Sequence, residues 1–422
     1  MRVLVIGGGG REHALIWKLS QSPQVDKIYC IPGNPGIAKL ACCVELDTAD
    51  NAALARFAQQ HDIGLTVVGP ELPLVNGISD YFANQGLAVF GPSRAAAQIE
   101  GSKTFAKDLM RKYGIPSARY AAFTSAEEAK AYIREQGAPI VVKADGLAAG
   151  KGVVVAFAVD EALEAVDSMM TERVFGDAGT VIVVEEFMEG EEASLLAFTD
   201  GYTVVPMVAA QDHKRIFDQD AGPNTGGMGT YAPAPVVTES LKQQIVREVL
   251  QPTVDAMREE GCLYQGCLYA GLMITAEGPK VVEFNARFGD PETQVVVPLL
   301  QTDLLAVLQA CVNGTLADMD IEWTSEAAVC VVLAAGGYPG WYQKGHAISG
   351  IESAEHQGAL VFHAGTASAK GEIVSAGGRV LGVTAVSSTI AAAVDKVYAA
   401  VTDIHFTDMH YRRDIAHRAL NR

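Results

Sequence analysis

The first hundred residues alternate short apolar runs with helical stretches, and this order constrains the fold more than any other feature of the chain. A buried run from Val3 to Ile6 leads into a glycine turn and then into a helix over 11–20. Three further apolar runs, separated by helical stretches, lie at 27–31, 65–68 and 87–90. Strands that alternate with helices in this way form a parallel, doubly wound sheet. We therefore expect an α/β domain at the N-terminus.

The pattern changes after a helix near 102–113. Two strand-like runs, 140–143 and 153–157, are joined by a loop too short for a parallel crossover, so we expect them to pair antiparallel. Strands and long helices between 194 and 325 predict an α+β core, and the remaining strands with their glycine-rich turns predict a small, mostly antiparallel domain. The division that we expect is a Rossmann-like N-terminal domain at 1–101, a core at 102–122 plus 194–326, a flap subdomain at 123–193 and a C-terminal domain at 327–422.

The charge balance and the cysteines limit the classes of partner. The chain has 32 Lys and Arg against 50 Asp and Glu, a formal net charge of −18, so an anionic ligand must be held by local cations and nucleic acid is disfavoured. The 7 cysteines show no CxxC spacing, which argues against a disulfide framework and against structural zinc. We see no basic leader and no apolar run of spanning length, and so expect a cytoplasmic protein without a membrane partner.

The N-terminal turn from Gly7 to Glu12 fails as a dinucleotide fingerprint. Glu12 takes the place of the third glycine of G-x-G-x-x-G, and the second strand ends in Ile-Pro-Gly-Asn, without the acidic residue that meets a ribose. What remains is a glycine-lined helix N-terminus beside Arg11, which suits one phosphate or another small anion. The alternative is that the glycines only permit a tight turn. The turn at 69–71, which contains Glu71, should reach the same edge of the sheet.

The stretch KADGLAAGKG, residues 143–152, lacks three properties of a Walker P-loop: its spacing, the hydroxyl after its lysine and the helix that follows it. Gly146 and Gly150 have three residues between them, and a strand follows Gly152. A glycine-rich loop between antiparallel strands can lay its N–H groups over phosphates as a movable flap, with Lys143 adding a cation. The alternative is a flexible hairpin with two solvated lysines.

Two later strand ends carry groups suited to a nucleotide and a metal. The strand at 181–186 ends in carboxylates, which fits backbone contacts to an adenine edge and a carboxylate on a ribose; a charged, solvated turn is the alternative. Farther along, a period of two places Glu283 and Asn285 on one face of a strand, and their oxygens suit magnesium. Arg287 and Asp290 follow at once, and a structural ion-pair network is the competing interpretation.

The loop from 211 to 235 shows little apolar periodicity, although it lies inside a compact domain. A loop of this length is usually disordered or functional, and its polar and cationic groups favour function. His213 is a candidate general base, although a lone histidine in such a loop is more often a hydrogen-bonding residue.

Together these motifs carry a family resemblance. In chain order they are VLVIGGGGREHAL, KADGLAAGKG, VVEEFMEGEEAS, QDHKR followed by AGPNTGGMG, and EFNARFGDPE. The chain closely resembles the phosphoribosylamine-glycine ligase family of the ATP-grasp superfamily over essentially its whole length, including GGYPG at 336–340, HAGT at 363–366 and YRRDIAHRAL at 411–420. The resemblance implies a central ATP-grasp fold and a monomeric ligase of purine biosynthesis that uses Mg²⁺ or Mn²⁺.

The reaction implied by the resemblance joins glycine to 5-phosphoribosylamine and converts ATP to ADP and phosphate. The glycine carboxylate would attack the γ-phosphate, and the amine of phosphoribosylamine would then attack the carbonyl of glycyl phosphate. Such a reaction needs positioning and charge neutralisation more than a nucleophilic side chain. This agrees with a sequence that offers cations, a flap and metal ligands but no catalytic triad.

Carried over residue by residue, the resemblance implies several groups of site residues. The ATP-binding group would be Lys103, Lys143, Gly146, Ala149, Gly150, Lys151, Gly152, Glu185, Glu186, Phe187, Met188, Glu191, Glu192 and Lys214, with Glu192 favoured over Glu191 for the ribose. Glu283 and Asn285 would hold magnesium, and Arg287, Asp290 and Asp212 would act in catalysis and orient glycine. The other substrate-binding positions would be Gly8, Gly9, Gly10, Arg11, Asn34, Glu71, Thr225, Gly227, Met228 and Gly289.

One departure from the wider superfamily concerns a second magnesium. Many members supply a further acidic ligand from the strand before the Glu-x-Asn strand, whereas that strand here reads Tyr-Ala-Gly-Leu-Met at 269–273. Two other functions remain open at this stage: an ATP-grasp ligase with a different acid or amine, and a non-catalytic nucleotide-binding regulator. The intact set of Glu283, Asn285 and Arg287 argues against the regulator.

Overall fold

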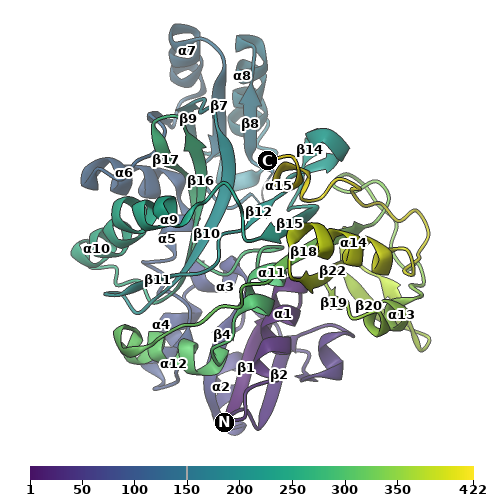
Figure 1. Ribbon diagram of the computed structural model, residues 1–422. Coiled ribbons are helices and arrows are strands. Elements are labelled where there is room, and N and C mark those ends of the chain that lie inside the picture. Colours follow the sequence, from purple (N-terminus) through teal and green to yellow (C-terminus); the bar gives the residue numbers. More distant parts are fainter. Residues whose placement is uncertain (149–150) are drawn as a thin grey trace.

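The N-terminal part forms the expected parallel sheet, with strand order β3-β2-β1-β4-β5. The computed structural model describes residues 1–148 and 151–422 (Figure 1). Along β1, Leu4 and Ile6 enter one hydrophobic core and Val3 and Val5 another, so both faces of the sheet are covered, as in doubly wound folds. The elements of this part are β1 (Arg2–Gly7), α1 (Gly10–Leu19), β2 (Lys27–Pro32), β3 (Cys42–Cys43), α2 (Asn51–Gln60), β4 (Ile63–Val68), α3 (Glu71–Val75), α4 (Ile78–Asn84), β5 (Val89–Phe90) and α5 (Gln98–Gly101).

The flap is a four-stranded antiparallel sheet of order β6-β9-β7-β8, at the top of Figure 1. The strands before and after the glycine-rich stretch pair antiparallel, as expected, with Lys143 opposite Val153. The side chains of α7 and α8 pack with those of the sheet in one small core. The elements are α6 (Lys103–Tyr113), which precedes the flap, β6 (Tyr120–Phe123), α7 (Ala126–Gln136), β7 (Ile140–Ala144), β8 (Val153–Ala156), α8 (Val159–Val166) and β9 (Ile182–Glu186).

The core sheet has the order β11-β10-β16-β17 and is antiparallel throughout. Its register sets Gly271 opposite Glu283 and Tyr269 opposite Asn285. One of the helices expected between 194 and 325 is interrupted near Pro298, between α11 and α12, because the ring nitrogen of this proline has no hydrogen to donate to a helical bond. The elements are β10 (Glu191–Thr199), β11 (Val204–Pro206), α9 (Glu239–Ile245), α10 (Gln251–Glu259), β16 (Gly266–Thr275), β17 (Gly278–Asn285), α11 (Thr293–Val296) and α12 (Leu304–Asn313).

The C-terminal sheet has the order β12-β15-β18-β22-β19, and two of its strands come from the loop at 211–235. This loop therefore contains regular structure that its composition did not reveal, because its strands are short and β15 finds its partner β18 far along the chain. The elements are β12 (Gln211–Asp212), β13 (Arg215–Phe217), β14 (Ala221–Asn224), β15 (Gly229–Ala232), β18 (Ala327–Ala334), α13 (Ile351–His356), β19 (Leu360–His363), β20 (Thr366–Ala369), β21 (Glu372–Ser375), β22 (Arg379–Ser387), α14 (Ile390–Val401) and α15 (His417–Leu420).

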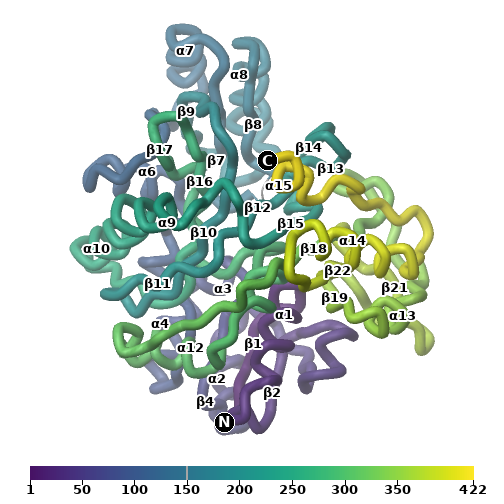
Figure 2. The backbone as a smooth tube through the Cα atoms, viewed as in Figure 1, coloured from purple at the N-terminus to yellow at the C-terminus, as the bar shows by residue number. Residues whose placement is uncertain are grey.

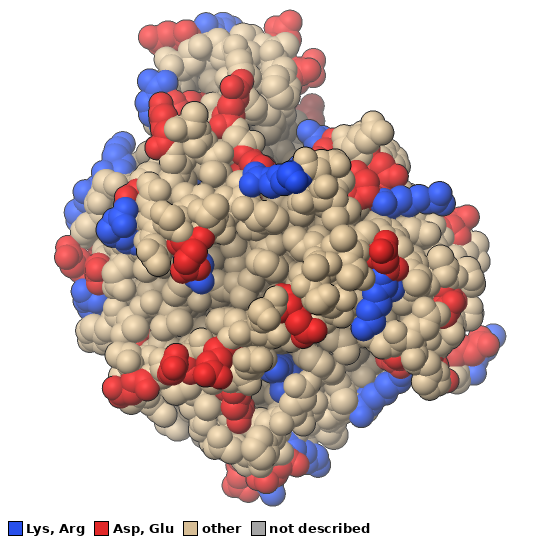
Figure 3. Space-filling model, in the orientation of Figure 1, with Lys and Arg blue, Asp and Glu red and all other residues tan. Residues whose placement is uncertain are grey.

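The surface carries charges of both signs. On the face shown in Figure 3, Lys and Arg side chains are scattered among Asp and Glu and form no continuous basic patch. The 7 cysteines all lie in the described part of the chain and are free thiols. Among the described helices, none has both the length and the apolar character that crossing a membrane requires.

Candidate active site

A cleft of about 530 Å³ lies where the flap, the core sheet and the N-terminal domain meet. It is lined by polar side chains from segments that are far apart in the sequence, including α3, α6, β7, β10, β12 and β17. The predicted site residues that line it are Arg11, Glu71, Lys103, Lys143, Gly152, Glu185, Glu186, Phe187, Met188, Glu192, Asp212, Lys214, Thr225, Glu283, Asn285, Arg287 and Asp290.

Other predicted residues lie next to this cleft without lining it. Lys151 instead lines a larger cavity of about 960 Å³ between β8, the β13–β14 hairpin and the loop at 336–340. This larger cavity shares Val153, Val155 and Asn224 with the cleft, but the clustered carboxylates and cations belong to the smaller space. Ala149 and Gly150 fall outside the described residues. The remaining predicted residues that do not line the cleft are Gly8, Gly9, Gly10, Asn34, Gly146, Glu191, Gly227, Met228 and Gly289.

The glycine turn after β1 is filled by the side chain of Glu12, a residue of the helix that follows the turn. The Glu12 carboxylate folds back over the turn, where Oε2 accepts the Gly9 N–H at 2.6 Å and Oε1 accepts Arg11 Nε at 2.5 Å. A Cβ at Gly69 would lie 2.0 Å from Glu12 Oε1, so the neighbouring turn must also be glycine. The residue that breaks the dinucleotide fingerprint is therefore a capping carboxylate, and Arg11 is the group from this turn that lines the cleft.

Asn34 uses its side-chain amide to fix the backbone around the same turn. Its Nδ2 donates to Gly8 O and to His363 O, each at 2.9 Å, and its Oδ1 accepts the N–H groups of Gly36 and Ile37. With every polar atom of the amide engaged, the side chain of Asn34 holds the turn against the C-terminal domain.

A buried triad of charges lies at the inner end of the cleft. Glu185 at the end of β9 pairs with Lys143 of β7 at 3.0 Å and with Lys107 of α6 at 2.9 Å. Burial alone would raise the pKa of Glu185, but the two ammonium groups hold it below its usual value. Lys143 also donates to Val282 O at 3.0 Å, which ties the flap to the core sheet. One carboxylate thus balances two cations, and the triad retains a net positive charge for an anion.

Two further lysines approach the cleft from opposite sides. Lys103, at the first turn of α6, donates to Gly146 O at 3.3 Å, and burial lowers its pKa. Lys214 pairs with Glu192 at 2.9 Å, and this carboxylate raises the pKa of Lys214 well above its usual value. The neighbouring Glu191 turns away from the cleft, where Gln211 Nε2 donates to it at 2.9 Å and Arg422 pairs with it. Of the two glutamates, Glu192 is the one that lines the cleft.

Glu283 and Asn285 project from the end of β17 into the cleft. Burial would raise the pKa of Glu283, but Lys214, Lys143, Lys103 and Arg287 together lower it. Within the described residues the Glu283 carboxylate has no hydrogen bond or ion pair, so its oxygens are free to bind a cation. Asn285 Oδ1 accepts Arg287 Nη2 at 3.0 Å and no other donor from residues 1–148 and 151–422, and so keeps a lone pair.

This donor set fits Mg²⁺ or Mn²⁺. The described residues contain no group of three or more His, Cys, Asp or Glu arranged for a metal. A cation here would therefore take two oxygen ligands from the protein and the others from phosphates and water, as magnesium usually does in phosphoryl-transfer sites. Gly271 faces Glu283 on β16, so the departure seen in the sequence is real: β16 adds no carboxylate at that level.

Arg287 is held by carboxylates from two other segments. Its Nη2 lies 2.9 Å from Glu100 Oε1, and its Nε lies 3.4 Å from Glu71 Oε2. Glu100 also accepts the Ala286 N–H at 2.6 Å. The ion-pair network proposed as the competing interpretation therefore exists around Arg287, whereas Glu283 stands outside it. The ion-pair network therefore applies to Arg287, and the metal-ligand interpretation applies to Glu283.

Asp290 is positioned by the C-terminal domain. Arg379, the first residue of β22, donates from Nη1 to Asp290 O at 2.8 Å and to Gly226 O at 2.6 Å. Its Nη2 lies 3.4 Å from Asp290 Oδ2. Burial would raise the pKa of Asp290, but Arg379 and Arg11 lower it. Arg379 therefore fastens the segment after β17 to the loop that contains Thr225.

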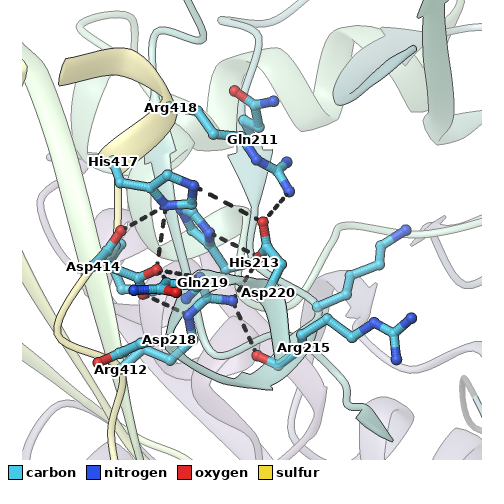
Figure 4. Close-up of polar contacts among 12 residues, drawn as sticks. Gln211, His213, Arg215, Asp218, Gln219, Asp220, Arg412, Asp414, His417 and Arg418 are labelled. Atoms are coloured by element: carbon cyan, nitrogen blue, oxygen red, sulfur yellow. Dashed lines mark hydrogen bonds and ion pairs between the residues drawn. The ribbon is translucent and has the colours of Figure 1, made fainter. Parts of the chain in front are cut away.

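Asp212 and His213 point in opposite directions from neighbouring positions. Asp212 lines the cleft, where burial raises its pKa to about 7; Lys214 opposes the rise, and Glu292 and Glu192 add to it. The His213 side chain is fully buried on the other side, where its Nε2 accepts the Ala416 N–H at 3.0 Å (Figure 4). Burial lowers the pKa of His213 to about 4. His213 does not line the cleft and is a hydrogen-bonding residue there.

Several cleft residues have no signal in the sequence that would have identified them. Apart from Glu292, which ends the motif EFNARFGDPE but received no role from it, they lie outside the recognised motifs and reach the cleft only through folding. A weak indication existed for Lys107, one helical turn after Lys103 on the same face of α6. These residues are Glu100, Lys107, Tyr269, Glu292 and Arg379.

Family models cover most of the chain. The model described as phosphoribosylglycinamide synthetase, N domain, matches residues 1–100, the ATP-grasp (A) domain matches 101–293, and the C domain matches 328–418. Among solved structures, the phosphoribosylamine--glycine ligase of Thermotoga maritima is 33% identical with a TM-score of 0.85, covering 99% of this chain and 100% of that one. The biotin carboxylase domain of Hydrogenobacter thermophilus 2-oxoglutarate carboxylase, 16% identical with a TM-score of 0.73, covers 97% of this chain and 91% of that one and shares the fold.

Relatives of known name agree over the full length. The phosphoribosylamine--glycine ligase of Brucella melitensis is 54% identical over 423 residues, covering 100% of this chain and 99% of the relative. That of Vibrio cholerae is 53% identical over 425 residues, with the same coverage. With the ATP-grasp architecture and the cation-lined cleft, these matches show that the chain belongs to the phosphoribosylamine--glycine ligase family and is an ATP-dependent ligase.

Proposed function

We propose that the cleft joins glycine to 5-phosphoribosylamine in two steps through glycyl phosphate. In the first step a glycine carboxylate oxygen attacks the γ-phosphorus of ATP, and ADP leaves. In the second step the amine nitrogen attacks the acyl carbon, phosphate leaves with the electrons of the broken C–O bond, and the amine loses a proton. The observation that carries this proposal is the convergence of cations and metal-type oxygens in one cleft, which suits charge neutralisation and positioning.

The nucleotide would lie between the flap and the core sheet. Lys103 and Lys143 would neutralise its phosphates, with Lys214 beside the ribose, and the stretch Gly146–Gly152 would cover them. Backbone groups of Glu185, Glu186, Phe187 and Met188 would hold the adenine edge. Glu192 would bind the ribose hydroxyls, because it lines the cleft while Glu191 is engaged by Gln211 and Arg422.

Glu283 and Asn285 would hold the metal, which draws charge away from the phosphates when it is bound. Arg287 would then stand beside the metal ligands, where its guanidinium can stabilise the negative charge of the acyl phosphate. Its ion pairs with Glu71 and Glu100 keep it in place before substrates arrive. Asp290 and Asp212 would orient the glycine ammonium.

The ribose phosphate of the second substrate would bind on the N-terminal side of the cleft. Arg11 and Glu71 line that side, and Asn34 fixes the turn of Gly8, Gly9 and Gly10 behind them. Further contacts would come from the backbone of Thr225, Gly227, Met228 and Gly289. The enzyme would act as a monomer in the cytoplasm, a compartment that free cysteines suit.

The activity is tested by measuring ADP release with ATP, magnesium, glycine and phosphoribosylamine, each omitted in turn. We expect sustained turnover only in the complete mixture, because the acyl phosphate formed without amine has no acceptor. Sustained turnover with another acid or another amine would contradict the substrate assignment, and ATP binding without turnover would contradict catalysis.

Glu283→Gln should lower kcat by about a hundredfold or more, because an amide replaces the only free carboxylate at the metal position. Mn²⁺ binding, followed by electron paramagnetic resonance with a non-hydrolysable ATP analogue, should weaken in parallel. The matched control is Glu277→Gln, on the turn of the same hairpin and paired only with Lys280. Near-normal turnover or unaltered Mn²⁺ affinity in Glu283→Gln would refute the metal assignment.

Lys107→Met should raise the KM for ATP by about tenfold, equivalent to about 1.4 kcal/mol of binding free energy. Without Lys107, the Glu185 carboxylate has Lys143 as its only counter-ion and draws that ammonium away from the phosphates. The double variant Lys107→Met/Glu185→Gln should recover ATP affinity, and Lys112→Met, on the exposed side of α6, should leave it unchanged. An unchanged KM in the single variant would contradict this role.

The KM for glycine should fall as pH rises from 6 to 8. The raised pKa of Asp212, about 7, leaves the group largely neutral at pH 6, and the carboxylate that pairs with the glycine ammonium forms as pH rises through that value. Asp212→Asn should remove this pH dependence and raise the KM throughout. The KM for ATP, measured over the same range, serves as the control. A glycine KM that stays flat in the unaltered protein would argue against Asp212 as the ammonium partner.

A further inference from the structure

The segment 411–422, here called the tail, lies against residues 211–225. These residues contain Asp212 and Lys214 and are here called the catalytic loop. In Figures 1 and 2 the yellow end of the chain reaches the teal strands β12 to β14, and Ile415 and Ala416 of the tail also pack in the core formed with β18 and β22. Arg412 Nη1 pairs with Asp220 Oδ1 at 2.8 Å, and Arg418 Nη2 pairs with Asp220 Oδ2 at 2.7 Å. The two arginines therefore hold one carboxylate of the loop from two sides (Figure 4).

Backbone groups reinforce this contact in both directions. The Gln219 N–H donates to Asp414 Oδ2 at 2.8 Å, and the Arg413 N–H donates to Asp218 Oδ1 at 2.8 Å. Arg412 is fully buried and also binds Asp414, with Nε to Oδ1 at 2.7 Å. If the tail moved away from the loop, the buried guanidinium would lose both Asp220 Oδ1 and Arg215 O, which accepts from Nη1 at 3.2 Å, so the contact resists partial opening.

His213 connects this cluster to the cleft. Its imidazole is inserted into the tail, with Nε2 accepting the Ala416 N–H at 3.0 Å and Nδ1 lying 3.8 Å from Asp220 Oδ1. Successive side chains of an extended segment point to opposite faces. With His213 fixed on the tail side, Asp212 and Lys214 must both face the cleft, and both line it.

A second contact reaches the proposed ribose site. Arg422 pairs with Glu191, which also accepts Gln211 Nε2 at 2.9 Å. Gln211 donates to Glu192 O at 2.7 Å, and Glu192 pairs with Lys214 at 2.9 Å. The tail thus contacts Glu191 and His213, which directly precede Glu192 and Lys214 in the sequence. None of the tail residues lines the cleft.

We propose that the tail is a positioning element of the active site: by binding His213, Asp220 and Glu191 it fixes the orientation of Asp212 and Lys214. This inference rests on the roles proposed above for Asp212 and Lys214. It assigns to the C-terminal domain a function in catalysis that its own side chains, apart from Arg379, do not reveal.

The test compares Arg418→Gln with the matched control Arg413→Gln in the complete enzyme. Both change an arginine of the tail, but within the described residues the Arg413 side chain has no ion pair, and its backbone contact is kept. We expect Arg418→Gln to lower kcat/KM for glycine three- to tenfold with an unchanged melting temperature, and Arg418→Lys to restore most of it. Arg413→Gln should behave as the unaltered enzyme.

Two readouts separate positioning from a structural contribution to stability. First, a loosened Asp212 gains solvent, so the midpoint of the pH dependence of glycine KM should move below 7 in Arg418→Gln. Second, amide hydrogen exchange in 211–225 should become faster in Arg418→Gln and stay unchanged in the control Arg413→Gln. If Arg418→Gln lowers the melting temperature, the same kinetic and hydrogen-exchange measurements on Arg422→Gln test the positioning role instead.

Unchanged kinetics, midpoint and exchange in both Arg418→Gln and Arg422→Gln would overturn the inference. The outcome is distinguishable from failure of the proposed function, because Asp212→Asn tests that separately. If Asp212→Asn alters glycine KM and the tail variants do not, the tail inference alone is wrong. If Asp212→Asn has no effect, the role of Asp212 is wrong and the exchange data still report whether the tail orders the loop.

Discussion

The assembly of the cleft depends on the ion pairs made by the largely buried guanidinium of Arg287. This guanidinium joins Glu71 of α3, Glu100 of α5 and Asn285 at the end of β17. Removing one partner of such a buried pair typically costs about 3–5 kcal/mol, because an uncompensated charge remains. The same group that holds these segments together is therefore the one that we propose to stabilise the acyl phosphate, and its ion pairs fix its position.

The cleft concentrates cations within an acidic molecule. The chain carries a formal net charge of −18, and Lys103, Lys107, Lys143 and Lys214 line the cleft together with Asp and Glu side chains that slightly outnumber its cations. Their mutual repulsion and burial are costly without an anion, and a bound triphosphate relieves both. Specific pairs limit this cost in the free protein: Glu185 serves two lysines and Glu192 serves one.

The order and type of the elements could be predicted from sequence because local periodicity and turn chemistry agree with the final fold. The strands on both sides of KADGLAAGKG, the strand with Glu283 and Asn285, and the helix near 102–113 were all predicted in this way. What could not be predicted depends on pairing between distant segments. Strands β12 and β15 are too short to show a period, and Arg379 and Glu100 reach the cleft only through tertiary packing.

The site was predicted best where a residue type and its neighbours define the chemistry, and worst where orientation decides. Glu191 and Glu192 are equivalent in sequence, and only the partners Gln211 and Arg422 distinguish them. Glu12 looked like a defect in a glycine fingerprint, whereas in the fold it caps the turn. In each case the deciding contact crosses a distance in sequence, or a change in backbone direction, that local patterns do not encode.

The pairing of β15 with β18 has a consequence for the modularity of the enzyme. The C-terminal sheet takes its edge strand β12 and the adjacent strand β15 from the middle of the chain, so this sheet is built from two separate parts of the sequence. Cutting the chain near 326 would leave β18 with an unpaired edge and β15 without its sheet. Recombination between relatives at that boundary would combine a β15 and a β18 from different proteins. The catalytic loop and the C-terminal domain must therefore be inherited as one unit.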